Sequence, residues 1–409
     1  MQFEDKEYYG EIWFPDKESE KEFCVLKREN NNIILTTKLS ERNQYSSDLI
    51  FGVFTGLGYL TFINNKVINS SSGMITSKSY SPDYCLIGEH FIKNPKEFKT
   101  LKATIVNSDL RKWLWLLLFD FSIDGTSVSF NENINNEVII DNSTKLSIYT
   151  WTKQKSSRTN YNIELQSKAS LSFDFNEVRS IIDVIDLYHK FQKFLLFFHG
   201  STKQFESFSL TCEDCEERFE LYFKDGFHKE NNYSILNLNY TDLKNDIESI
   251  FIEWFNNDNI IICIDKILNN SLSNKLSYSQ KFINAYIALE SYLKRFSNSN
   301  GKDFKVYLEK HKEIIQSITG IEANQTTPYL TSLIRTRDYY VHDNINQKQY
   351  FKGIDLLYEA IMLESLVSIL ILKEFKVSDF VINKAIKNAN SDYINSKQTN
   401  LIFNKNILK

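Results

Sequence analysis

The chain has 409 residues, of which 42% are hydrophobic and 24% are charged. These fractions are close to those of globular proteins, so they exclude a disordered or fibrous chain, and the length favours two or three domains. The formal net charge of −4 excludes a protein that binds nucleic acid through a uniformly basic surface, although it is compatible with a local basic patch.

Up to about residue 151 the sequence alternates between short β-type runs and polar turns rich in Asn and Ser. Examples of such runs are residues 32–37, 49–54 and 59–63. Strands joined by short polar turns pair with their neighbours in the antiparallel direction. The first third of the chain is therefore predicted to be an antiparallel β-structure.

The apolar pattern changes at about residue 176. Over residues 176–198 apolar side chains recur at steps of three and four, which predicts a long helix that ends before Gly200. A further β-like stretch runs from 206 to 240, because Phe219, Leu221 and Phe223 alternate with polar residues and Leu236 and Leu238 repeat this spacing.

After residue 240 the strand signals disappear and helical periodicity takes over. The predicted helices span residues 242–256, 260–268, 277–296, 302–318, 331–341, 347–375 and 378–389. The sequence thus predicts an α+β protein of several domains, with a β-rich domain at 1–240 and an all-α bundle at 241–409.

One segment near the end of a predicted helix concentrates side chains that can do chemistry. Residues 333–344 read LIRTRDYYVHDN. His has an unperturbed pKa of about 6.5, so His342 can give or accept a proton at neutral pH. Arg337 presents a permanently charged planar fork that fits phosphate oxygens. RNA carries its own nucleophile, the 2′-hydroxyl, so these two residue types suffice to cleave it.

This segment resembles the Arg-x4-6-His signature of HEPN-type ribonucleases, with Arg337 and His342 in the signature positions and Asp338 as the polar residue after the Arg. The upstream helix 281–293 contains an Ala-Leu-Glu segment similar to that of the ApeA-like HEPN group, and Glu290 takes its acidic position. Residues 10–15, the segment around Gly52 and residues 86–91 are similar to the domain that precedes ApeA-type HEPN domains.

The resemblance implies that the helical bundle is a HEPN domain with endoribonuclease activity. It implies a metal-independent enzyme without a cofactor, which attacks RNA through the 2′-hydroxyl, leaves a cyclic phosphate and acts in abortive infection against phage. tRNA is one candidate target. The β-rich domain at 1–240 is then expected to sense a phage-derived trigger or to regulate the nuclease.

The spacing of Arg337 and His342 restricts how they can act together. Five residues on an ideal helix rotate by about 500°, so the two side chains point about 140° apart. Either the helix ends before His342, where Asp343 and Asn344 suit a turn, or a second copy completes the site across a two-fold interface. We expect both, and the resemblance implies a homodimer through the helical domain.

Neighbouring residues are assigned supporting roles. Asp338 and Glu290 are expected to orient the Arg337–His342 pair. The residues expected to contact RNA are Arg335, Tyr339, Tyr340, Lys310 and Lys312, with the tyrosines stacking on a base.

Simpler roles are also open for these residues. The Arg and the His can face solvent or cap the helix end, and at least one of the tyrosines can pack in the core. The alternative function is a non-catalytic helical module for interaction or dimerisation, or an RNA-binding protein.

The five cysteines give a weaker signal. Cys212 and Cys215 form a Cys-x-x-Cys pair, which is half of a structural zinc site, but no second pair follows. An odd number of cysteines and no apolar run near about 18 residues predict a reducing, cytoplasmic location without a membrane span.

Overall fold

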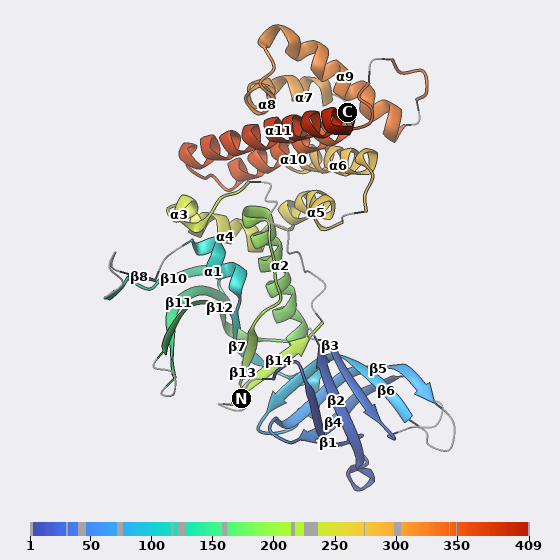
Figure 1. Cartoon of the computed structure of the whole chain (residues 1–409), viewed down its shortest axis with the longest axis vertical. Helices are drawn as coiled ribbons and strands as arrows, with labels where there is room; N and C mark the ends of the chain where they lie inside the picture. The colour runs from blue at the N-terminus through green and yellow to red at the C-terminus, as the bar shows by residue number, and fades with distance from the viewer. Residues whose placement is uncertain are drawn as a thin grey trace. The chain divides into compact units, whose positions relative to one another are not determined.

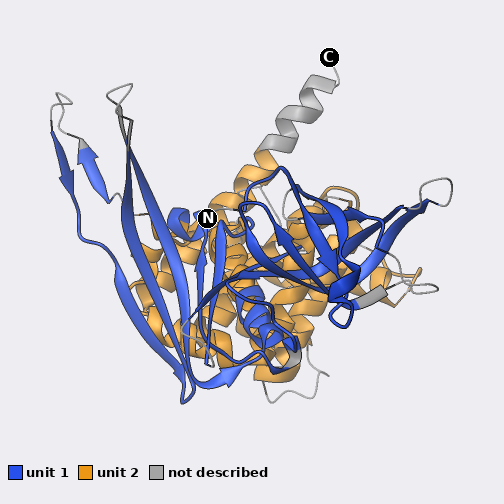
Figure 2. Cartoon of the chain, turned by 90° about the horizontal axis from the view of Figure 1, so that it is seen from below, with its two compact units in different colours: residues 1–112, 116–189, 203–228 blue, residues 113–115, 190–202, 229–409 orange. Residues whose placement is uncertain are grey.

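The computed structural model describes residues 3–29, 32–39, 46–71, 77–115, 118–121, 127–157, 162–213, 217–224, 236–273, 275–297, 304–342, 344–348 and 350–407. The chain divides into two compact units (Figure 2). Unit 1 comprises 1–112, 116–189 and 203–228, and unit 2 comprises 113–115, 190–202 and 229–409. Unit 1 is built on antiparallel strands and unit 2 on helices, which confirms the predicted fold class. The predicted domain boundary at residue 240 stays a prediction.

Unit 1 contains the strands β1 (Glu7–Trp13), β2 (Glu22–Glu29), β3 (Asn32–Thr37), β4 (Ser46–Phe54), β5 (Gly58–Ser71), β6 (Ser77–Gly88), β7 (Thr100–Val106), β8 (Phe119–Phe121), β9 (Val128–Phe130), β10 (Asn135–Asp141), β11 (Thr144–Ser157), β12 (Asn162–Arg179), β13 (Ser207–Cys212) and β14 (Arg218–Phe223). Two short 3-10 helices lie at Glu18–Glu20 and Pro95–Glu97, and α1 spans Ser108–Leu114.

The described strands of the larger sheet follow the order β10-β11-β12-β7-β13-β14-β6-β3-β2-β1-β4-β5 (Figure 1). Because β5 also pairs with β6, the six strands from β1 to β6 close on themselves as a barrel. Every second side chain points inward, and Ile12, Leu26 and Phe62 are fully buried there. A Cβ at Gly10 would lie 2.2 Å from the Val53 carbonyl oxygen, so glycine lets β1 approach β4.

The helix predicted at 176–198 is α2 (Ile181–His199). It begins five residues later than predicted, because β12 continues to Arg179, which pairs with Thr100 of β7. Ser180 and Asp183 then exchange side-chain and backbone hydrogen bonds of 3.2 Å, the reciprocal pattern of a capping box. The start of the helix is therefore fixed by this local capping and not by the first apolar residue of the helical pattern.

The β-like stretch predicted at 206–240 is only partly a strand. The hairpin of β13 and β14 accounts for its first half, residues 225–235 lie outside the described part, and residues 236–239 have no regular secondary structure. Leu236 and Leu238 repeat at a step of two because both side chains are buried in an irregular segment of unit 2, in which Asn237 has a φ of +48°. The prediction of a strand there was wrong.

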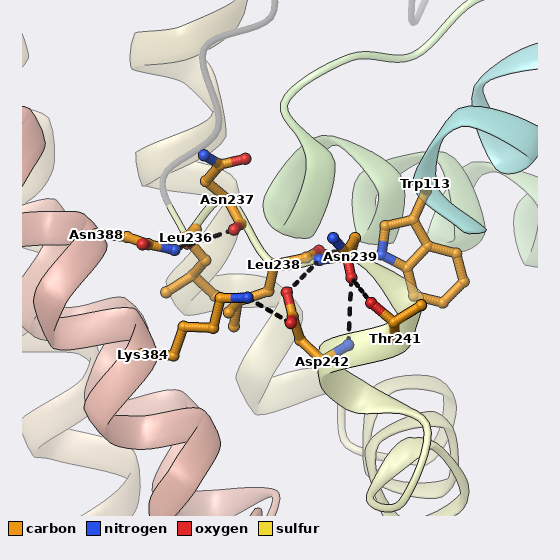
Figure 3. A network of polar contacts seen from close by, with 9 residues as sticks. All are labelled: Trp113, Leu236, Asn237, Leu238, Asn239, Thr241, Asp242, Lys384 and Asn388. Atoms are coloured by element: carbon orange, nitrogen blue, oxygen red, sulfur yellow. Dashed lines mark hydrogen bonds and ion pairs between the residues drawn. The ribbon is translucent and has the colours of Figure 1, made fainter. Parts of the chain in front are cut away.

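This irregular segment is fixed by backbone carbonyls that accept side-chain hydrogen bonds (Figure 3). The Trp113 indole N–H donates to the Leu238 carbonyl at 3.1 Å, and the Asn388 amide donates to the Leu236 and Asn237 carbonyls at 3.0 Å each. Asn239 and Asp242 then form a capping box, and Lys384 pairs with Asp242. The first helix after this segment starts at the box.

Unit 2 contains α3 (Tyr240–Leu243), α4 (Ile247–Asn256), α5 (Asp258–Leu272), α6 (Tyr278–Phe296), α7 (Phe304–Lys310), α8 (Lys312–Thr319), α9 (Ala323–Val341), α10 (Asp355–Glu374) and α11 (Asp379–Ile407). Helix α10 is buried almost all round, and α6, α8 and α11 pack against it. No helix in the described part of the chain is both long and apolar enough to cross a membrane.

Two helix boundaries near the signature segment differ from the prediction. Helix α9 begins at Ala323, eight residues early, because buried Thr326 extends the pattern of Leu330 and Leu333 toward the N-terminus. Helix α10 begins at Asp355 and not at 347, since Phe351 N–H bonds the Thr336 hydroxyl at 2.9 Å and Gly353 has a φ of +57°.

Candidate functional site

Two helices of unit 2 bring Arg337 and Glu290 together. Ser277 caps the start of helix α6, and its hydroxyl accepts a hydrogen bond from the Gln280 N–H at 3.2 Å. Tyr286 and Glu290 lie four residues apart on one side of α6, and Arg337 and Asp338 lie four and three residues before the end of α9 at Val341. The segment that carries Arg337 is thus set against α6 by helix packing.

The Arg337 guanidinium is held by two carboxylates and one ring, which we name the arginine clamp: Tyr286, Glu290 and Asp338. Nη2 of Arg337 donates to Oε1 of Glu290 at 2.7 Å, and Nη1 donates to Oδ1 of Asp338 at 3.0 Å. The guanidinium carbon lies 5.5 Å from the centroid of the buried Tyr286 ring, a cation–π distance. The clamp fixes the plane of the guanidinium.

The clamp is partly shielded from water, with the Arg337 and Glu290 side chains each 25% exposed. Burial acts to lower the pKa of Arg337, but the hydrogen bonds to Asp338 and Glu290 outweigh it and the net pKa is raised. Burial also raises the pKa of the Tyr286 hydroxyl, so this ring stays neutral. Two carboxylates face one guanidinium, and their net charge is −1.

Arg337 keeps donors that the clamp does not use. A guanidinium has five N–H groups, and each Nη atom bonds one carboxylate, so each retains a second N–H. Nε is buried and has no hydrogen-bond partner among the described residues, so it does not serve a ligand. The second N–H of each Nη atom can donate to the oxygens of a phosphate.

His342 is the first residue after α9. The helix ends at Val341, His342 has φ −110° and ψ 10°, and its side chain is exposed. The Asn344 N–H donates to the Asp338 carbonyl at 3.2 Å, which closes this helix end. Among the described residues, no hydrogen bond or ion pair joins His342 to Arg337, so a single copy does not bring the two side chains into contact.

An aromatic cluster lies beside the signature segment. Tyr339 stacks on Tyr350 with ring centroids 4.0 Å apart and planes at 16°, and Tyr340 lies edge-on to both rings. Lys352 Nζ lies 4.5 Å from the Tyr350 centroid. The Phe351–Thr336 hydrogen bond holds this connection against α9. Neither Tyr339 nor Tyr340 is in the buried core.

The other predicted RNA contacts are Arg335, Lys310 and Lys312. Arg335 is half-buried on α9, while Lys310 and Lys312 are exposed at the junction of α7 and α8. Between them, burial and the charges of Lys373 and Lys310 lower the pKa of His311 to about 4. His311 is therefore neutral at physiological pH.

The Cys-x-x-Cys pair is described only in part. Cys212 is a buried free thiol at the end of β13, and Cys215 lies outside the described residues. Across the described ranges, no three His, Cys, Asp or Glu side chains gather as a metal site would require.

Three residues of this region were not predicted from the sequence. Tyr286 lies one helical turn before Glu290, so helical periodicity, which places residues four apart on one face, could have identified it. Tyr350 and Lys352 belong to the irregular connection before α10, which the pattern assigned to a helix. Only the tertiary contact with Thr336 brings them to α9.

A protein-family model described as ApeA N-terminal domain 1 matches residues 7–254, more than half of the chain. No curated protein and no solved structure matches the chain.

Proposed function

Because the chain belongs to the family defined by ApeA N-terminal domain 1, an anti-phage defence family, we propose that it is a HEPN-type endoribonuclease. The observation that carries the proposal is the arginine clamp. It holds Arg337 with unused donors near the C-terminal end of α9, and an exposed His342 follows the end of that helix.

The proposed reaction uses groups of the substrate and two side chains. The 2′-hydroxyl oxygen attacks the adjacent phosphorus, and the bond from phosphorus to the 5′-oxygen breaks. His342 accepts the hydroxyl proton or protonates the leaving oxygen. Arg337 donates to the non-bridging oxygens, where negative charge develops. The products are a 2′,3′-cyclic phosphate and a free 5′-hydroxyl, and the step requires no metal ion or cofactor.

One feature of a single copy argues for a homodimer. His342 makes no hydrogen bond or ion pair with Arg337 among the described residues, so one copy holds the two side chains apart. In the proposed dimer, a second copy of the signature segment supplies the facing histidine.

The shared site has a direct test. The Arg337→Ala and His342→Ala variants are purified separately, mixed, dissociated and allowed to reassociate. A mixture that regains RNA cleavage supports a site built from two copies. A mixture as inactive as its two components contradicts it.

Purified protein incubated with total RNA in EDTA tests the activity itself. We expect cleavage by the wild-type protein, none by His342→Ala, and wild-type cleavage by His90→Ala. His90 is a matched control because it pairs with Glu217 in unit 1. Expression of wild-type protein should arrest growth and His342→Ala should not. Unchanged toxicity of a folded His342→Ala variant would remove the proposed role.

The substrate and the trigger are further parts of the proposal. tRNA is the first RNA to test, and a phage-derived trigger sensed by residues 1–240 is the proposed regulator. The proposed substrate and the proposed trigger both rest on the chain's membership of this family. If the folded wild-type protein leaves every RNA intact but forms stable complexes with RNA or with a second protein, the non-catalytic module is the better account.

A further inference from the structure

Unit 1 has a groove on the part of its sheet outside the barrel. Five neighbouring strands line it, namely β11, β12, β7, β13 and β14 (Figure 1). Its volume is about 650 Å³, and volumes of about 300–1,000 Å³ are usual for sites that bind small molecules. The groove is far from the signature segment in sequence, and nothing in the proposed nuclease uses it.

The strand register explains why its side chains converge. Trp151 of β11 lies opposite Lys168 of β12, and Lys153 lies opposite Gln166. Residues two apart on a strand share one face, so Lys155 points the same way as these four. Ile148 lies on the other face of β11, where it is fully buried. The groove is thus on the face that does not carry the apolar core.

The charges along the groove are uneven. Lys168 Nζ pairs with Glu206 Oε2 at 2.5 Å, so its charge is already balanced. Lys153 and Lys155 are exposed, and neither forms an ion pair or hydrogen bond among the described residues. On β14, four strands away from β11, Glu220 pairs with Arg218 at 3.2 Å. Glu164 of β12 lies opposite Lys155, so Lys153, Lys155 and this carboxylate leave the β11 side with one excess positive charge that suits an anion.

An aromatic surface lies next to these lysines. The Trp151 indole is half-buried and lines the groove, and no other aromatic ring in the described part packs on it. Indole rings stack on nucleobases, and this stacking tolerates any base. Trp151 offers a planar surface, and Lys153 and Lys155 offer unpaired ammonium groups two and four residues further along the same strand. Together they match a ligand that combines a flat ring with phosphate.

We propose that this groove binds a nucleotide, with its phosphates against Lys153 and Lys155 and its base on Trp151. A free nucleotide and a nucleotide within a nucleic-acid strand share this chemistry. The proposal concerns unit 1 alone, and it stands or falls independently of the nuclease.

Isothermal titration calorimetry with the full-length protein tests the groove. The probes are ATP, GTP and AMP, with inorganic phosphate and adenosine as partial ligands and a single-stranded DNA hexamer as the strand arm. We expect a nucleotide or the hexamer to bind roughly tenfold or more tightly than either partial ligand. Whichever of these two binds more tightly identifies the source.

Variants connect the binding to the proposed residues. Trp151→Ala should weaken binding roughly tenfold, and Trp151→Phe should retain most of it, because the ring still stacks. Lys153→Ala with Lys155→Ala should weaken binding and reduce its salt dependence. Trp115→Ala and Lys145→Ala are matched controls, since Trp115 is exposed elsewhere and Lys145 pairs with Glu137. Thermal melting verifies that each variant is folded.

Two results would overturn the proposal. One is that no nucleotide and no hexamer binds to the wild-type protein at about 1 mM, the weak end of useful affinities. The other is that folded Trp151→Ala, or the folded double lysine variant, binds as tightly as the wild-type protein.

Discussion

Replacement of Glu290 by Gln tests whether the arginine clamp positions Arg337. The substitution keeps the shape of the side chain and one acceptor oxygen but removes the charge. Hydrogen bonds to charged groups contribute about 1.5–3 kcal/mol, and neutral ones about 0.5–1.5 kcal/mol. The lower ends of these two ranges differ by about 1 kcal/mol. The 2.7 Å bond to Arg337 should weaken by about this amount, because only Arg337 stays charged and solvent screens both partners, which are 25% exposed.

That loss has opposite effects on the two kinetic constants. A looser guanidinium should lower kcat about fivefold, as about 1 kcal/mol of transition-state stabilisation implies. The same change removes one of the two negative charges beside the phosphate, so the KM for RNA should fall or stay constant. Replacing a residue that only stabilised the fold would lower the free energy of unfolding, and it would not change kcat and KM in opposite directions.

The assay is single-turnover and steady-state cleavage of an RNA oligonucleotide, with urea unfolding in parallel. Glu309→Gln, on the exposed surface of α7, is the matched control and should behave as the wild-type protein. A positioning role for Glu290 is refuted if Glu290→Gln keeps the wild-type kcat, or if kcat falls and KM rises while the variant remains folded.

Three further substitutions test contacts of unit 2. Arg337→Lys keeps the charge but loses the fork that bonds two carboxylates. The rate of RNA cleavage should fall at least tenfold, while RNA binding measured by a filter assay persists. Cleavage at the wild-type rate would contradict this prediction. Thr336→Val leaves the Phe351 N–H without its acceptor, so the free energy of unfolding in urea should fall by about 1–3 kcal/mol. An unchanged free energy of unfolding would show that this hydrogen bond is dispensable. Burial raises the pKa of Glu359 to about 7, above its unfolded value, although the hydrogen bond from Tyr329 acts to lower it. The stability that protonated Glu359 contributes is then complete below about pH 4.5 and is lost as the pH rises to about 7. At pH 8, Glu359→Gln should therefore unfold at a higher urea concentration than the wild-type protein. Identical dependence of the urea midpoint on pH in the two proteins would refute this prediction.

The sequence predicted the fold class, and it nominated the residues of the candidate site. Arg337 and His342 stand out because their residue types and spacing are local properties. Glu290 was nominated by the resemblance of its Ala-Leu-Glu segment, and the structure places it against Arg337, 47 positions away in the sequence. Periodicity also placed most helices of unit 2, since their buried faces repeat every three to four residues.

The start of α2 is set by the capping box of Ser180 and Asp183, a local motif that apolar periodicity does not detect. Other features depend on contacts that no local pattern encodes. The segment of Leu236 and Leu238, predicted as a strand, is irregular and is held by Trp113 and Asn388. Tyr350 reaches Tyr339 through a connection pinned to Thr336. The groove in unit 1 depends on strand register, which pairs residues such as Trp151 and Lys168 across two strands.

The central claim is that Arg337 and His342 cleave RNA through its own 2′-hydroxyl. The most direct measurement is mass spectrometry of the ends produced from an RNA oligonucleotide, beside the same oligonucleotide with one 2′-deoxy sugar at the cleavage position. We expect 2′,3′-cyclic phosphate and 5′-hydroxyl ends from the wild-type protein, no product from the 2′-deoxy substrate, and none from His342→Ala. Cleavage of the 2′-deoxy position, or equal product from the folded His342→Ala variant, would contradict the claim.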